Sequence, residues 1–67
     1  MSPAATMSVD TARRAVLRAA DDLFYVHGIG GVVMSDIRDA SGVSMRRLYS
    51  MFPSKSELVA AWLTDRH

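Results

Sequence analysis

The chain has 67 residues, which is room for one small domain, and it has no cysteine, so disulfides cannot stabilise it. Hydrophobic residues make up 49% of the sequence, too many for a disordered tail, and no apolar run approaches the ~18 residues of a transmembrane helix. The net charge of +1 does not indicate a nucleic-acid partner, so the position of the charges has to decide.

The first element expected from the sequence is a long helix over residues 10–27. Residues 1–9 precede it; they are mostly small and polar, lack the pattern of a signal peptide, and are expected to form a flexible lead-in. Asp10 is expected to cap the helix and Gly28 to end it. One apolar stripe recurs at three- and four-residue steps, at Val16, Ala20, Leu23, Phe24 and His27.

A glycine-containing turn at 29–31 leads to a short second helix, expected over residues 34–41. Ile37 and Ala40 are three residues apart and are expected to face inward. Ser35 is expected to cap this helix if it begins slightly later than Met34.

Gly42 suits the left-handed conformation that ends a helix and turns the chain sharply. Val43 is expected to fill the corner, and Ser44 is a good N-cap for a third helix that reaches Phe52. Two short helices joined by such a turn form a helix-turn-helix, which is expected over about residues 33–52.

A fourth helix is expected after Pro53, because the residue before a proline avoids helical angles. Ser54 and Glu57 have the spacing of a capping box at its start. The fold class is therefore all-α: a homeodomain-like helix-turn-helix domain of three helices plus the start of a fourth, over residues 10–67. No strand pattern is present in the sequence.

No acidic residue lies between Asp39 and Glu57, and the cations Arg46, Arg47 and Lys55 all fall inside this stretch. These cations lie in the first turns of the third and fourth helices, where the helix dipole disfavours positive charge by ~0.3–1 kcal/mol. Cations beside exposed backbone N–H groups become favourable when a phosphate is the partner, so the pattern indicates DNA binding.

Three other functions compete with DNA binding as interpretations of the sequence. A small helical module that grips an acidic protein partner fits the same cations and stays open as the alternative. Catalysis and metal binding have little support, because His27 and His67 are the only histidines and no carboxylates cluster near them. A membrane-surface helix is excluded because the basic and apolar residues do not share one long face.

A specific order of residues runs from about Arg13 to Leu58. It comprises Ala19-Ala20, Leu23-Phe24, Gly28, Asp36-Ile37, Gly42-Val43-Ser44, Leu48-Tyr49, Phe52, Pro53-Ser54-Lys55 and Glu57-Leu58. This order resembles the TetR family of bacterial transcriptional regulators.

The resemblance implies that the third helix enters the major groove of double-stranded operator DNA. It implies that Met45, Arg46 and Arg47 lie nearest the base edges, and that Tyr49 and Lys55 contact backbone phosphate. Leu48 and Phe52 match core positions instead. The full set of expected DNA-binding residues is Ser35, Ser44, Met45, Arg46, Arg47, Tyr49, Ser50 and Lys55.

Five positions depart from the family pattern. Val33 stands where a threonine commonly caps the second helix, and Ser50 replaces a frequent histidine. Arg38 replaces a small alanine, so either its stem reaches solvent or the helix packing is shifted. Arg46-Arg47 replace a common glycine–threonine pair, which indicates a guanine-containing target, because arginine bonds guanine in a bidentate manner.

The resemblance also implies a ligand-binding and dimerisation domain after the fourth helix, which this sequence lacks, so we expect a fragment of a longer repressor. A homodimer and a small-molecule effector are expected only with that domain, and no cofactor is expected. The expected location is the bacterial cytoplasm, at the nucleoid. An apolar face of the fourth helix would then cover either the first helix or the missing domain; it comprises Leu58, Val59, Trp62 and Leu63.

Overall fold

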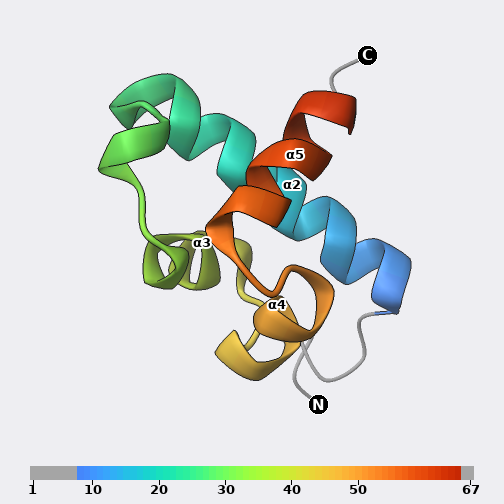
Figure 1. Ribbon diagram of the computed structural model, residues 1–67. Helices are drawn as coiled ribbons and strands as arrows, with labels where there is room; N and C mark the ends of the chain where they lie inside the picture. The colour runs from blue at the N-terminus through green and yellow to red at the C-terminus, as the bar shows by residue number, and fades with distance from the viewer. Residues whose placement is uncertain (1–7, 66–67) are drawn as a thin grey trace.

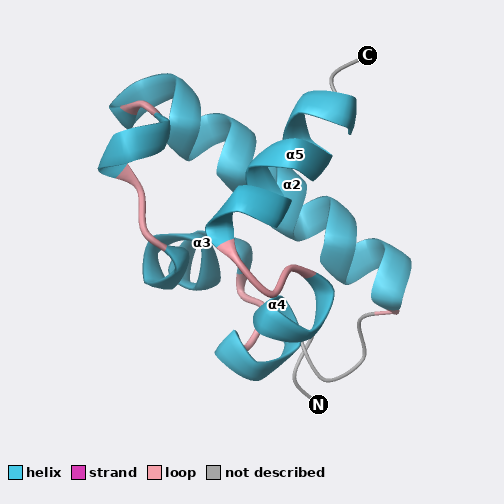
Figure 2. Cartoon of the chain, in the orientation of Figure 1, coloured by secondary structure: helices cyan, strands magenta, loops and turns pink. Residues whose placement is uncertain are grey.

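The computed structural model describes residues 8–65, and all of its regular structure is helical (Figures 1 and 2). Among the described residues there is no strand, in agreement with the expected all-α class. None of the described helices is long and apolar enough to cross a membrane. The elements are α2 (Val9–His27), the 3-10 turn η1 (Ile29–Gly31), α3 (Met34–Ser41), α4 (Met45–Met51) and α5 (Lys55–Asp65).

Helix α2 begins one residue earlier than the sequence predicts. The Oγ atom of Ser8 accepts a hydrogen bond from the Thr11 N–H at 3.1 Å, so Ser8 is the N-cap and Asp10 lies within the first turn. The predicted cap at Asp10 is therefore wrong, because a serine two positions earlier already satisfies a free N–H group of the first turn. Of the predicted lead-in, residues 1–7 lie outside the described residues.

The carboxyl end of α2 follows the prediction. Gly28 has φ 77°, and its N–H donates to the Phe24 carbonyl at 2.9 Å. A side chain is strained at that φ, so glycine is the residue that allows the chain to leave the helix here.

Helix α2 is the support on which the other helices pack. It contacts both α3 and α5, and in Figure 1 α5 crosses it while α3 and α4 lie below. Ile37, Leu48 and Leu58 each bring a fully buried side chain from a different helix. Burying a side chain of this size stabilises the fold by ~1.5–3 kcal/mol. The core comprises Ala12, Val16, Leu17, Ala20, Phe24, Val32, Met34, Ile37, Val43, Leu48, Phe52 and Leu58.

Ala40, which the sequence places on the inner face of its helix, is exposed, and so is His27 at the end of the apolar stripe of α2. His27 is the last residue of α2, beyond the part of the stripe that the other helices cover. On α3 the buried residues are Met34 and Ile37, so the inner face is centred between them. Three further residues along a helix rotate the side chain by roughly 60°, which carries Ala40 off that face.

Helix α5 is held to α2 through its tryptophan. The Trp62 ring meets the Phe24 ring edge-on, with centroids 5.0 Å apart, and its Nε1 donates to the Asp21 carboxylate at 2.9 Å. Leu58 is fully buried, whereas Leu63 is half exposed. Leu58 and Trp62 therefore cover α2, the first of the two alternatives that the sequence left open for the apolar face of this helix.

Candidate nucleic-acid interface

The candidate site is built on the turn between α3 and α4. Gly42 ends α3 in the left-handed conformation, with φ 75° and ψ 5°, and its N–H donates to the Arg38 carbonyl at 3.0 Å. The predicted role of Gly42 is confirmed, because residues with a side chain rarely adopt this φ.

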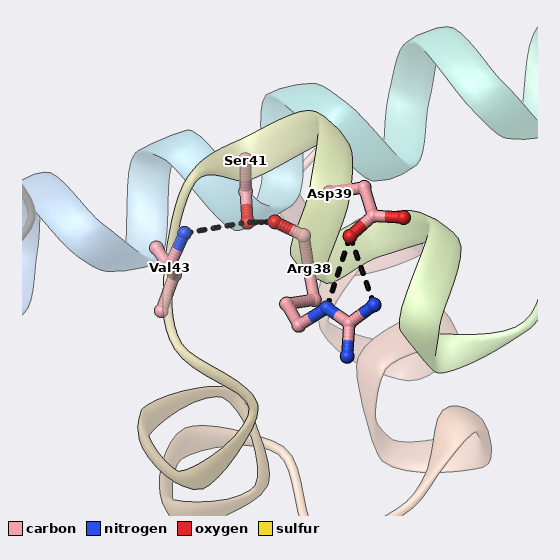
Figure 3. Close-up of polar contacts among 4 residues, drawn as sticks. All are labelled: Arg38, Asp39, Ser41 and Val43. Carbon is pink, nitrogen blue, oxygen red and sulfur yellow. Dashed lines mark hydrogen bonds and ion pairs between the residues drawn. The ribbon is translucent and has the colours of Figure 1, made fainter.

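Two further hydrogen bonds order this turn (Figure 3). The Ser41 hydroxyl donates to the Arg38 carbonyl at 3.4 Å and accepts from the Val43 N–H at 3.2 Å. The Val43 side chain is almost fully buried, as predicted for a residue that fills the corner. Local hydrogen bonds and one buried side chain thus order the turn between α3 and α4.

Ser44 begins α4 as predicted. Its backbone is extended, its Oγ accepts from the Arg47 N–H at 3.2 Å, and its carbonyl accepts from the Leu48 N–H at 2.8 Å. Only some of the free N–H groups in the first turn are satisfied by these bonds, as in any helix start. This end of α4 carries no acidic residue.

The inner face of α4 anchors it to the core through Leu48 and Phe52, both buried. Met45 is half-buried and packs against the same core, so it does not face fully outward as expected. The reason is its spacing: Met45 precedes Leu48 by three residues and Phe52 by seven, which places all three on one side of the helix.

The outer face of α4 carries Arg46, Tyr49 and Ser50, which are exposed. Tyr49 keeps 43% of its surface accessible, and Arg47 is intermediate between buried and exposed. Polar and cationic groups therefore surround the amino-terminal turn of a helix whose other side is fixed in the core. A helix presented in this way can enter a groove of DNA with its first turn leading.

Two expected contact residues lie outside α4. Ser35 is half-buried in the first turn of α3 and does not cap it, because Val33 precedes the helix and the Asp36 Oδ2 accepts from the Val33 N–H at 3.0 Å. Lys55 is the first residue of α5 and is also half-buried.

The start of α5 agrees with the predicted capping box in its serine half. The Ser54 Oγ accepts from the Glu57 N–H at 3.2 Å. This bond orients the first turn of α5, and with it the backbone of Lys55.

Arg38, at the position of the family's small alanine, points to the solvent side of α3. Its guanidinium forms an ion pair with the neighbouring Asp39 at 2.9 Å, and both side chains are well exposed (Figure 3). The side chain thus reaches solvent, the first of the two outcomes expected for this substitution. An exposed pair of this kind contributes only ~0–1 kcal/mol to stability.

Two side-chain roles were missed by the sequence analysis. Asp36 caps α3, and a signal was present, because its spacing from Val33 is that of the second residue of a capping box. Arg13 lies with its guanidinium carbon 5.8 Å from the centroid of the Phe52 ring. No local pattern relates residues so far apart in the sequence.

The described residues hold no group of three side chains able to bind a metal ion. What this surface offers is cations, hydroxyls and a helix amino terminus, which suit the phosphates and base edges of a nucleic acid.

Comparison with known proteins gives a consistent set of relatives. The family model described as bacterial regulatory proteins, tetR family, matches residues 16–62, which include α3, the turn and α4. The HTH-type transcriptional regulator TtgR of Pseudomonas putida is 34% identical over 55 residues, which is 82% of this chain and 26% of that protein. The probable HTH-type transcriptional regulator ArpR, also of Pseudomonas putida, matches with the same identity and coverage. The chain thus spans about a quarter of the length of these relatives, and no solved structure matches it significantly.

Proposed function

This chain belongs to the tetR family of bacterial regulatory proteins, and from this we propose that it is the sequence-specific DNA-binding part of a transcriptional regulator. The family consists of DNA-binding regulators and not of enzymes. The alternative, a helical module for an acidic protein partner, is not favoured, because both relatives are named as HTH-type transcriptional regulators.

The observation that supports this proposal best is the division of α4 into two faces. Leu48 and Phe52 hold the helix in the core, while Arg46 and Tyr49 are exposed on the other side. In a helix-turn-helix the second helix lies in the major groove, with the residues of its amino-terminal end at the base edges. We therefore assign α4 as the helix that reads an operator half-site.

The proposed contacts follow from the chemistry of each side chain. Arg46 and Arg47 would bond base edges, where arginine pairs with the O6 and N7 atoms of guanine. Met45 is packed against the core, so it would contribute at most an apolar edge to the base contact. Phosphate contacts, which position the protein, would come from Ser35, Ser44, Tyr49, Ser50 and Lys55.

We further propose that the complete regulator is a dimeric repressor. An effector bound by another part of that regulator would change the distance between two copies of α4, and with it the affinity for an operator that has two half-sites. The relatives are about four times as long as the matched segment, which leaves room in such proteins for these functions. A DNA target implies action in the bacterial cytoplasm, at the nucleoid.

Selection of duplexes from a random library, followed by binding titrations at several salt concentrations, tests the proposal. We expect one sequence to be enriched and to bind more tightly than a scrambled duplex of equal length at physiological salt. The logarithm of the affinity should fall linearly with the logarithm of salt concentration, by ~0.9 per phosphate contact. Equal affinity for selected and scrambled duplexes would overturn the assignment.

A further inference from the structure

Helix α4 is too short to hold its own orientation. It has seven residues, and isolated helices shorter than ~12–15 residues are marginal in water. Its direction therefore depends on what it packs against as well as on the turn that precedes it. At its carboxyl end that contact is made by Phe52, the C-cap residue, which is 5% exposed and whose N–H donates to the Leu48 carbonyl at 2.8 Å.

A charged group of α2 covers this same residue. The guanidinium carbon of Arg13 lies 5.8 Å from the centroid of the Phe52 ring, within the ~6 Å range of a cation–π interaction. Arg13 belongs to the amino-terminal half of the longest helix, next to the buried residues Ala12 and Val16. The end of α4 thus contacts the longest helix of the domain.

We propose that Arg13 is a positioning residue for α4: by holding the Phe52 ring against α2, it aligns the DNA-reading helix and so contributes to sequence discrimination without touching a base. This inference rests on the proposed function. Base contacts depend on alignment within ~0.5 Å and 10–20°, so a small rotation of a seven-residue helix weakens them. Phosphate contacts from flexible side chains tolerate such a rotation better.

The opposing possibility is that Arg13 binds a DNA phosphate directly, since its side chain is exposed. The two roles differ in what they change. A phosphate contact adds ~0.9 to the salt dependence and strengthens binding to every duplex alike. A positioning role leaves the salt dependence unchanged and acts on the preferred duplex.

Amide hydrogen exchange on the free chain tests the contact between Arg13 and Phe52 in the absence of DNA. In Arg13→Met, which keeps an apolar stem but removes the charge, the Phe52 amide should exchange ~2–5-fold faster, as a cation–π interaction of ordinary strength implies. The Ile37 amide of α3 should be unaffected. Arg14→Met, at the next position of the same helix, is the matched control and should leave both amides unchanged. Equal exchange at Phe52 in the two variants would overturn the inference.

The effect of Arg13 on sequence discrimination is tested by titrating each variant with the selected and scrambled duplexes. The affinities are corrected for the fraction of each variant that is folded. Arg13→Met should lower the ratio of the two affinities ~2–5-fold with an unchanged salt dependence, and Arg13→Lys should restore part of that ratio. In a Phe52→Leu background the effect of Arg13→Met should disappear, because Arg13 acts on α4 through the Phe52 ring.

An equal loss of affinity for both duplexes, with a salt slope reduced by ~0.9, would assign a phosphate contact to Arg13 instead. If the wild-type chain prefers no duplex, the proposed function fails, while the exchange experiment still decides the contact.

Discussion

Arg47 and Lys55 carry the same charge at the starts of successive helices, and the proposal gives them different tasks on DNA. Arg47→Ala should cost ~1–3 kcal/mol of binding to the selected duplex and relax the preference at one base pair, because a bidentate contact to a base is lost. Binding titrations against duplexes changed one base pair at a time measure both effects.

Lys55→Ala is the matched variant for this experiment. It should weaken binding to all duplexes about equally and reduce the salt slope by ~0.9, as loss of a phosphate contact requires. If the two variants changed the affinities and the salt slope in the same way, the division between base contacts and phosphate contacts would be wrong.

Gly42 is the residue whose backbone sets the angle of the motif. Gly42→Ala should destabilise the domain by ~1–2 kcal/mol, because φ 75° is strained for any residue with a Cβ atom. The added methyl would itself meet no atom within 4 Å, so the effect isolates the backbone. Gly30→Ala is the control: there is equal space at Gly30 and its φ is not positive, so thermal denaturation should show a much smaller loss.

At the scale of a helix, α4 depends on its cap more than a long helix would. Ser44→Ala removes the acceptor of the Arg47 N–H and should destabilise the domain by ~1 kcal/mol, measured by urea denaturation. Ser56→Ala, at an exposed position within the first turn of α5, should change stability far less. If both variants lost the same stability, the Ser44 hydrogen bond would not be what starts α4.

The helices whose limits depend on their own residues were predictable from sequence. Gly28, Gly42 and Ser44 act through backbone conformation or through bonds within one turn, and each was assigned its observed role. The cap predicted at Asp10 was wrong, because Ser8 satisfies the Thr11 N–H instead. The wrong expectation at Ala40 concerns which side of a helix is covered by its neighbours. That is decided by tertiary packing, which periodicity gives only to within part of a turn.

Within the candidate site the same distinction holds. The exposure of Arg46 and Tyr49 follows from the buried positions of Leu48 and Phe52 on one short helix, so the sequence predicts it. The half-buried state of Met45 follows from its spacing to Leu48 and Phe52, so it too could have been predicted. The approach of Arg13 to Phe52 depends on how α2 and α4 pack together, which no local pattern contains.

For the whole molecule, charge is distributed in a way that its net value conceals. The sum is +1, yet between Asp39 and Glu57 the chain carries cations and no acidic residue. That stretch includes all of α4 and the start of α5, whereas the acidic residues lie on α2, α3 and the rest of α5. Such an asymmetry directs one surface of a nearly neutral domain toward the phosphates of DNA.

Under the proposed function a single domain reads one half-site, and joining two domains tests whether the operator is a paired site. Fusion of the chain to a parallel two-stranded coiled coil through a flexible linker should raise the affinity for a palindromic duplex ~10²–10⁴-fold over the unfused chain, because the second contact becomes intramolecular. Fluorescence anisotropy on duplexes with different half-site separations measures the gain. We expect the gain in affinity to be largest where the two half-sites lie on one side of the DNA, about 10–10.5 base pairs or a multiple apart.

Inserting about five base pairs turns one half-site to the opposite side of the DNA and should remove most of the gain. If the gain in affinity did not depend on this spacing, the two copies would bind DNA independently of half-site position. That result would contradict an operator with two half-sites, each read by one α4 helix.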